Sequence, residues 1–521
     1  MLVGEDDLRP SLEDDPLKVD SYQLSADRSK LLIYTNSKRV WRRKTRGDYW
    51  VYDISGRSLH QLGGPDAAPS SLMFAELSPD GENVCYVWEN NLYVEDLRGG
   101  HIRALTSDGS ETLINGTFDW VYEEELGLRK GFRWSPDSAH LAFWQLNTEG
   151  VRIFHLINNT DSLYPELIPI PYPKVGERNA TARIGVLSIK ENKPPVWIDM
   201  PGDPREHYLS HLNWIEGPDQ LVIRQLNRLQ NTARVFLADP ASGEAESLFT
   251  DQDEAWVDTP PQIWIDHDTA FLWQSERDGW RHVYRVSRDG NEVQLVTPGD
   301  FDVTSIAGVD EKNDHLYFMA SPDDATCRYL YRINLDGTGQ VRVTPEGRTG
   351  VHRYQLDPTC RWAVHRFSNM ATPPVADLIK IDGHETIEAL SKNEKLKKEI
   401  AALAIAEPEF FQIEIEDGTR LDGWCLKPQN MDTGKKHPIL FRVYGEPAGQ
   451  TVMNQWSGKR HLWHLMLTQQ GYVVISVDNR GTPAPRGRDW RKSVYRQVGI
   501  LASADQAAAT RALLKERPYL D

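Results

Sequence analysis

The chain has 521 residues, which is too long for one ordinary hydrophobic core, so two to four domains are expected. Hydrophobic residues make up 40% and charged residues 26%, the composition of an ordinary globular protein, and the net charge of −17 argues against a general nucleic-acid binder, which would need a basic face. The sequence holds no run of eighteen apolar residues that could form a membrane-spanning helix.

The N-terminal residues 1–16 are acidic and lack the apolar core of a signal peptide. This predicts either a cytoplasmic protein or one whose true N-terminus is missing. In the second case the full-length protein, called the parent below, would be periplasmic or secreted. Four widely spaced cysteines form no Cys-x-x-Cys pair, so zinc and redox motifs are not indicated. Cys327 and Cys360 could pair in an oxidising compartment, and free buried thiols are the equal alternative.

From about residue 20 to 390 the chain repeats one pattern of turns and strands. Leu77-Ser78-Pro79-Asp80-Gly81 and Trp134-Ser135-Pro136-Asp137 are the clearest turns, and each is followed by alternating apolar residues. Such a turn presets a tight reversal, and the period of two gives strands with one buried face. We count six or seven such units, each of about four strands, which is typical of propeller blades. A β-sandwich is the alternative. The first blade is expected to be incomplete.

The rhythm changes near residue 391. Residues 391–407 favour a charged helix that ends at a proline, and we predict a linker there. Residues 408–521 then alternate strand and helix patterns, and the segments 437–446 and 471–481 contain the near-continuous apolar runs of buried strands. This predicts a β-propeller over 1–390, a linker over 391–407, and the N-terminal half of an α/β domain over 408–521.

Three adjacent carboxylates stand beside large aromatic residues in Asp119-Trp120-Val121-Tyr122-Glu123-Glu124-Glu125. Side chains alternate along a strand, so consecutive acids cannot all face one way unless a helical turn or bulge intervenes. Two carboxylates that converge there would hold an ammonium group by charge-assisted hydrogen bonds. A solvated acidic loop is the alternative.

This segment, followed by the Trp-Ser-Pro-Asp turn, resembles the glutamate-pair motif of the dipeptidyl peptidase IV family, and residues 172–187 (YPKVGERNATARIGVL) resemble a second family segment. The resemblance covers nearly the whole chain. It implies an all-β propeller, eight-bladed in the intact parent, followed by a partial α/β-hydrolase domain. It also implies that Glu124 and Glu125 bind the free amine of a peptide substrate.

Two further segments carry the resemblance. Val40-Trp41-Arg42-Arg43 is similar to a stretch whose arginine contacts a substrate carbonyl, which implies that role for Arg42. Residues 443–447 (VYGEP) are similar to the family's V-Y-G-G-P, whose tyrosine donates its hydroxyl to the oxyanion, which implies that role for Tyr444. Glu446 replaces the usual glycine, and we expect it to remove backbone freedom and add charge near the oxyanion site. Trp280-Arg281-His282 also resembles a family segment and is predicted to be structural.

The catalytic nucleophile is absent. An α/β-hydrolase presents its serine in a G-x-S-x-G turn, and none occurs in the 521 residues. In the family this turn would follow Pro518-Tyr519-Leu520-Asp521 almost immediately. The sequence is therefore interpreted as a fragment, inactive alone, of a serine dipeptidyl aminopeptidase that would release X-Pro or X-Ala dipeptides. The predicted partners are peptides with a free N-terminus and, for the parent, a second copy in a homodimer. No metal or nucleotide cofactor is implied.

Two alternatives remain. An oligopeptidase or acylaminoacyl peptidase would share the architecture, although the adjacent glutamates argue against it. The second is a non-catalytic propeller protein that binds peptides or partners and carries a vestigial hydrolase half, and both the missing serine and Glu446 favour it.

Overall fold

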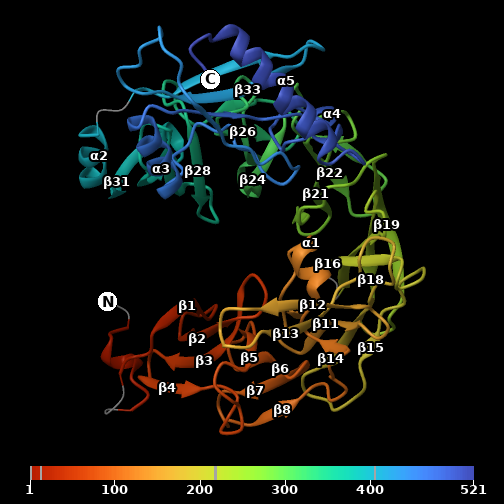
Figure 1. The fold of residues 1–521 in the computed structure, drawn as a ribbon. Coiled ribbons are helices and arrows are strands. Elements are labelled where there is room, and N and C mark those ends of the chain that lie inside the picture. The colour runs from red at the N-terminus through yellow and green to blue at the C-terminus, as the bar shows by residue number, and fades with distance from the viewer. Residues whose placement is uncertain (1–2, 12–14, 216–219, 404–405) are drawn as a thin grey trace. The chain divides into compact units, whose positions relative to one another are not determined.

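The computed structural model describes residues 3–11, 15–215, 220–403 and 406–521. They form two compact units, 1–251 and 252–521, each built mainly from antiparallel sheets (Figure 1). Residues 216–219 of the repeating region and residues 404–405 of the predicted linker lie outside the described residues. None of the described helices is both long enough and apolar enough to cross a bilayer.

The first unit opens with a short 3-10 helix, η1 (Asp6–Leu8), and an eight-stranded sheet that consists of two four-stranded blades. The segment predicted to hold an incomplete first blade forms four strands in it. The strands of this sheet are β1 (Val19–Leu24), β2 (Lys30–Arg39), β3 (Lys44–Asp53), β4 (Ser58–Gln61), β5 (Leu72–Leu77), β6 (Asn83–Trp88), β7 (Asn91–Asp96) and β8 (Ile102–Ala104).

Two more blades complete this unit, and a separate hairpin projects from the first of them. The blade strands are β9 (Leu113–Asn115), β10 (Phe132–Trp134), β11 (His140–Asn147), β14 (Thr181–Ser188), β15 (Val196–Trp197), β16 (His207–Ile215), β17 (Gln220–Asn227), β18 (Thr232–Ala238) and β19 (Ala245–Gln252). The hairpin pairs β12 (Ile153–Asn158) with β13 (Glu166–Pro171), and it leaves large apolar side chains exposed, among them Ile157 (61%) and Leu163 (92%).

The second unit begins with three four-stranded antiparallel blades. Their elements are β20 (Ile263–Ile265), β21 (Ala270–Ser275), β22 (His282–Ser287), β23 (Val293–Leu295), β24 (Val303–Asp310), η2 (Glu311–Asn313), β25 (His315–Ala320), β26 (Tyr329–Asn334), β27 (Val341–Arg342), β28 (Val351–Leu356), β29 (Trp362–Ser368), β30 (Val375–Lys380), η3 (Asp382–His384) and β31 (Glu385–Ser391). The described residues thus form seven blades, six with four strands and one with five, and the predicted propeller architecture is confirmed at the level of its repeating unit.

The predicted turns form for the expected reason. In the Ser78-Pro79-Asp80-Gly81 turn the Asp80 carboxylate accepts from the Glu82 backbone N–H at 3.0 Å, and Gly81 takes a φ of 70°. The matching turn of the next blade places Ser138 at that position with a φ of 60°. The left-handed conformation is therefore set by the turn, and glycine adopts it without the cost that a side chain adds.

After β31 the chain forms α2 (Glu394–Ala401) and then a mixed four-stranded sheet. The sheet order is β32 (Glu409–Glu414), β33 (Arg420–Leu426), β35 (Val473–Val477) and β34 (Ile439–Phe441), in which only β34 and β35 are parallel. α3 (Lys459–Gln469) connects this parallel pair, α4 (Arg488–Lys492) follows β35, and α5 (Ile500–Glu516) ends the chain.

Alternation along β33 distributes its side chains between two helices. Leu421 and Cys425 pack in a cluster with Leu513 of α5, whereas Trp424 and Leu426 pack in another with residues of α3. Successive side chains of a strand face opposite sides of the sheet, so each face needs its own cover. Helices on both faces are the arrangement expected of the first half of an α/β-hydrolase sheet.

A buried ionic cluster connects α4 to the blade of β20–β23. The Arg491 guanidinium lies 2.5 Å from the carboxylate of Asp302 and also bonds Glu276, and Lys492 lies 2.7 Å from both Glu276 and Asp253. These five side chains are at most 8% exposed. Burial alone would raise the pKa of Asp253, but its bonds to Arg488 and Lys492 outweigh burial and lower the pKa to about 2. All the carboxylates of the cluster have cationic partners.

We predict that Arg491→Met strongly destabilises the chain. The change leaves Glu276 and Asp302 buried without their main cation, and breaking a buried pair in this way costs about 3–5 kcal/mol. Urea unfolding measures the loss. Arg511→Gln is the control, because Arg511 and Glu416 form an exposed pair, 61% and 77% accessible, and such a pair contributes less than about 1 kcal/mol. Equal midpoints for the two variants would contradict the prediction.

Candidate functional site

The acidic segment forms a short helix, α1 (Trp120–Leu126), between β9 and β10. Its N-cap is Asp119, whose carboxylate accepts a hydrogen bond from the Tyr122 backbone N–H at 3.0 Å, and it ends at Gly127 with a φ of 67°. Asp followed by a helix and a left-handed glycine is a standard start and stop signal. Of the arrangements considered for the three adjacent acids (a helical turn, a bulge or a solvated loop), the helical turn is the one present.

The three glutamates differ in their surroundings. The Glu123 side chain is only 11% exposed, and its carboxylate lies 3.6 Å from the Arg129 guanidinium. Burial raises the pKa of Glu123, although Arg129 opposes the rise. Side chains of consecutive helical residues project about 100° apart, so the three glutamates cannot all point in one direction. Glu123 is therefore part of the packing, and Glu124 and Glu125 are the pair left for a ligand.

Arg42 meets Glu124 directly. Arg42 lies in the turn between β2 and β3, and its guanidinium is 2.6 Å from the Glu124 carboxylate. The arginine side chain is 75% exposed and the glutamate 22%. Glu125 is exposed, and no cation in the described part of the chain forms an ion pair with it. Arg42 and Glu124, which are 82 positions apart and were both predicted from the sequence, thus form an ion pair, and the Glu125 carboxylate next to them has no cationic partner among the described residues.

The helix is anchored through Tyr122. Its buried hydroxyl accepts a hydrogen bond from the Leu209 backbone N–H of β16 at 3.1 Å, and its ring stacks on Phe118 with centroids 5.4 Å apart. The Trp144 indole N–H of β11 donates to the Leu209 carbonyl at 2.9 Å. Two blades therefore hold the helix in place through one strand position, which fixes the direction of its glutamates.

One neighbour of the site was not predicted. The Tyr172 ring packs against Trp120 of α1 with centroids 4.3 Å apart, and Phe154 of the exposed hairpin packs against the same tyrosine at 5.5 Å. Tyr172 begins the YPKVG segment that carried part of the family resemblance. That resemblance was the available signal, because nothing in local sequence spacing links residue 172 to residue 120.

Asp119 is unusual as a helix cap because it is 3% exposed. Burial raises its pKa to about 6, even though backbone N–H groups of Tyr122 and Val121 stabilise the carboxylate. A buried carboxylate therefore caps the helix that carries the glutamate pair.

Tyr444, the site residue predicted in the α/β region, lies in an irregular segment after β34. Its side chain is 51% exposed, and the ring lies over Gly449, where an added Cβ would come within 2.8 Å of it. A glycine at 449 is thus required by the packing of the ring. The phenol is held at the surface, where its hydroxyl is available to donate.

The residues that follow β35 hold this segment at both ends. The Asn479 amide donates to the Gly445 carbonyl at 3.3 Å, and Gln506 of α5 donates to the Asn479 side chain at 3.2 Å. The buried Asp478 carboxylate accepts from the Thr451 backbone N–H at 2.9 Å and from the Val452 N–H at 3.0 Å. Residues 478–479 therefore have a structural role.

The backbone cost expected of Glu446 is not found. Gly445 takes the left-handed conformation with a φ of 81°, and residue 446 is not among the positions with positive φ. The glycine that this turn needs is present one position earlier. Glu446 is exposed, so its side chain enters solvent.

The remaining candidates have structural environments. His282 is 2% exposed, and its Nδ1 lies 2.7 Å from the Asp278 carboxylate, as predicted for a structural histidine. All four cysteines are free and buried, so Cys327 and Cys360 are not paired. Within the described ranges no cluster of three His, Cys, Asp or Glu residues could hold a metal ion.

Comparisons with known proteins agree with this architecture. A model described as the dipeptidyl peptidase IV (DPP IV) N-terminal region matches residues 25–374, and one described as the prolyl oligopeptidase family matches residues 460–521. The solved structure of Porphyromonas gingivalis dipeptidyl peptidase 4 is similar, with 27% identity and a TM-score of 0.91, over 100% of this chain and 72% of that chain.

Curated relatives show the same similarity. A protein named "Probable dipeptidyl peptidase 4" from Emericella nidulans is 29% identical over 96% of this chain. Dipeptidyl peptidase 4 of Trichophyton rubrum is 26% identical over 95% of it. The chain spans 66% and 65% of the lengths of these two relatives. The predicted fold, a β-propeller followed by a partial α/β-hydrolase domain, is confirmed.

Asp119→Asn is predicted to change how stability depends on pH. A carboxyl whose pKa is raised from 3.8 to about 6 by folding favours the native state at low pH, and this contribution is lost as the pH rises through 6. Asparagine still caps the helix and does not titrate. As the pH rises from 4 to 7.5, the free energy of unfolding of the variant should increase relative to that of the native chain by on the order of 2 to 3 kcal/mol.

Urea unfolding across that pH range measures the effect. The native chain, unfolded under the same conditions at each pH, is the reference. A constant difference between Asp119→Asn and the native chain would show that the cap does not titrate in this window.

Proposed function

Because the chain belongs to the dipeptidyl peptidase IV family, we propose that its parent is a serine-type dipeptidyl aminopeptidase, which releases X-Pro or X-Ala dipeptides from peptides with a free N-terminus. The relatives named dipeptidyl peptidase 4 support the coarse activity. The substrate preference, the serine mechanism and the roles of individual residues are part of the proposal.

The observation that carries the proposal is the Arg42–Glu124 pair next to the unpaired Glu125. A peptide's ammonium group that enters between the two glutamates would bring the local charge to balance, with two cations and two carboxylates. Charge-assisted hydrogen bonds of this kind are short and strong. Because α1 is anchored through Tyr122, the carboxylates are held in place before substrate arrives.

This arrangement accounts for exopeptidase specificity. A clamp on the terminal ammonium fixes how far a peptide can extend, so the bond to be cut lies a set number of residues from the N-terminus. Arg42 retains N–H donors beyond its bond to Glu124 and would donate to a substrate backbone carbonyl. Binding energy at the terminus is then used to position the scissile bond.

In the proposed reaction the parent's serine attacks the scissile carbonyl, the C–N bond breaks, and the shortened peptide leaves as an amine that takes up the serine's proton. Water then hydrolyses the dipeptidyl ester, which releases the dipeptide and restores the serine. The Tyr444 hydroxyl would donate to the oxyanion of the tetrahedral intermediate, and one such donor is worth about 3 kcal/mol. Asn479 and Asp478 support this role, because they fix the segment that carries the tyrosine.

A homodimer of the parent remains a proposal. The hairpin of β12 and β13 supports it, because Ile157, Leu163 and Leu167 are 61%, 92% and 59% exposed. Apolar side chains gathered on one projecting element mark an interaction surface more often than a free one.

Glu124→Ala and Glu125→Ala, each made in the parent enzyme, should each lower kcat/KM for a Gly-Pro reporter by at least about 100-fold, which corresponds to about 2.7 kcal/mol. Either change leaves the substrate ammonium with half of its counter-charge. Glu111→Ala, an exposed glutamate of the same unit, is the control and should retain full activity. Near-normal kcat/KM in both variants would refute the amine clamp.

The 521-residue chain alone should not cleave the same reporter, because its sequence contains no G-x-S-x-G turn. Measurable turnover by the pure chain would contradict this. For the parent, cleavage of free but not N-acylated peptides separates a dipeptidyl peptidase from an oligopeptidase or acylaminoacyl peptidase. Binding without any cleavage by the parent would favour the non-catalytic alternative.

A further inference from the structure

A groove of 790 Å³ lies between the blade of β24–β27 and the blade of β28–β31, within the second unit. Its walls come from the strands of the first blade and from the turns at 360–362 and 380–384 of the second. Small-molecule sites have volumes of about 300–1,000 Å³. The groove is therefore large enough for an organic ligand and far larger than a single water site.

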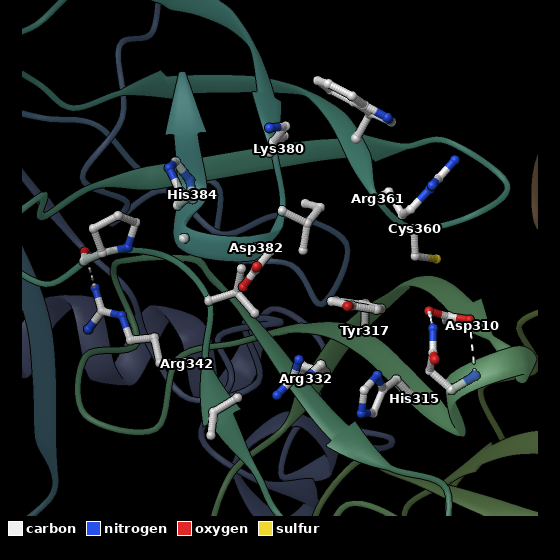
Figure 2. A pocket seen from close by; sticks show the side chains of 17 residues that line it. Asp310, His315, Tyr317, Arg332, Arg342, Cys360, Arg361, Lys380, Asp382 and His384 are labelled. Carbon is white, nitrogen blue, oxygen red and sulfur yellow. Dashed lines mark hydrogen bonds between the residues drawn. The ribbon is translucent and has the colours of Figure 1, made fainter. Parts of the chain in front are cut away.

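The groove is cationic in an acidic protein. Four basic residues line it, Arg332, Arg342, Arg361 and Lys380, against two acids, Asp310 and Asp382. Figure 2 shows Arg332 and Arg342 on one side of the cavity and Lys380 on the other, with Asp382 between them. The whole chain carries a net charge of −17, so this local excess of positive charge is the reverse of the average surface.

The acids of the groove do not neutralise its arginines. Both oxygens of Asp310 are engaged by Asn313, from its backbone N–H at 3.2 Å and its amide at 2.8 Å. Among the described residues, no carboxylate lies within ion-pair distance of Arg332, Arg342 or Arg361. Lys380 differs, since it lies 3.6 Å from the exposed Glu385.

Several other arginines of the same unit have acidic partners. Arg480 pairs with Asp505, Arg486 with Asp422 and Arg517 with Glu409, at 2.6, 3.3 and 2.7 Å. A guanidinium keeps its charge at every accessible pH and presents a planar set of donors that fits carboxylate and phosphate. Three arginines in one groove without such a partner indicate that the anion is supplied from outside.

Two of these side chains are already positioned. The Arg342 Nε donates to the Thr344 carbonyl at 3.0 Å, and the guanidinium lies 3.7 Å from the centre of the Tyr329 ring. Arg332 lies beside the buried Tyr317 and opposes the rise in its pKa that burial causes. Immobilised donors lose little conformational entropy when they bind a ligand, which favours affinity.

We propose that this groove binds a small organic polyanion with at least two phosphate or carboxylate groups. One group bonds Arg332 and Arg342, and a second reaches Lys380 and Arg361 on the facing blade. The site lies on residues that the proposed peptidase reaction does not use, so the proposal is independent of that function.

Isothermal titration calorimetry of the 521-residue chain tests the proposal, with pyrophosphate as the phosphate probe and citrate as the carboxylate probe. We expect one site for at least one probe, and the tighter probe identifies the class of anion. Raising the salt concentration from 50 to 200 mM should weaken binding, because exposed charges are screened within about 10 Å.

Three variants make the test specific. Arg332→Gln with Arg342→Gln should lower affinity at least about tenfold, since two charge-assisted contacts are lost. Asp382→Asn should raise affinity at least about twofold, because it removes a like charge, and a misfolded protein would not show this gain. Arg366→Gln, an exposed arginine on β29 outside the groove, is the control for charge and should stay within about twofold of the native chain.

The proposal is overturned if neither probe binds the native chain. It is also overturned if the double variant keeps the native affinity, or if Arg366→Gln weakens binding as much as the double variant does. The latter result would mean that the probes respond to net charge alone.

Discussion

The buried cluster of Arg491 and Lys492 with Glu276, Asp302 and Asp253 fixes how the last part of the chain is held. It joins α4 to a blade formed about 200 residues earlier, and almost none of it is accessible to water. Charges in such a place are tolerated only when each has a partner, so the cluster demands one arrangement of α4. The residues after β35 that support Tyr444 depend on the same fixed geometry.

The peptide-binding candidate arises from a local violation of the blade pattern. Strand-rich blades alternate their side chains, and α1 interrupts that alternation so that neighbouring glutamates project from a helix. The interruption carries a cost, visible in the buried carboxylate of Asp119 and its raised pKa. Tyr122 and the strand that it bonds offset that cost and hold the helix still. Local exceptions of this kind are where functional sites are expected.

The distribution of arginines distinguishes two uses of the same side chain. Where arginines connect elements of the fold, as at residues 480, 486 and 517, each meets a carboxylate of the chain. Arg42 meets Glu124 and remains mostly exposed, and the arginines of the inter-blade groove meet no carboxylate in the described residues. What distinguishes the groove is that three such arginines line one cavity.

The sequence by itself determined the repeating strands, the change to an α/β pattern after residue 408, and the candidate residues Glu124, Glu125, Arg42 and Tyr444, whose roles in binding and catalysis stay proposals. These follow from local periodicity, turn chemistry and motif resemblance, which act over a few residues. The sequence left residues 119–125 open between a helical turn, a bulge and a solvated loop. The tertiary structure decided that Arg42 contacts Glu124, that Tyr172 packs on Trp120, that Glu446 strains nothing, and that unpaired arginines share one groove. Those facts depend on contacts between residues tens to hundreds of positions apart, which no local pattern specifies.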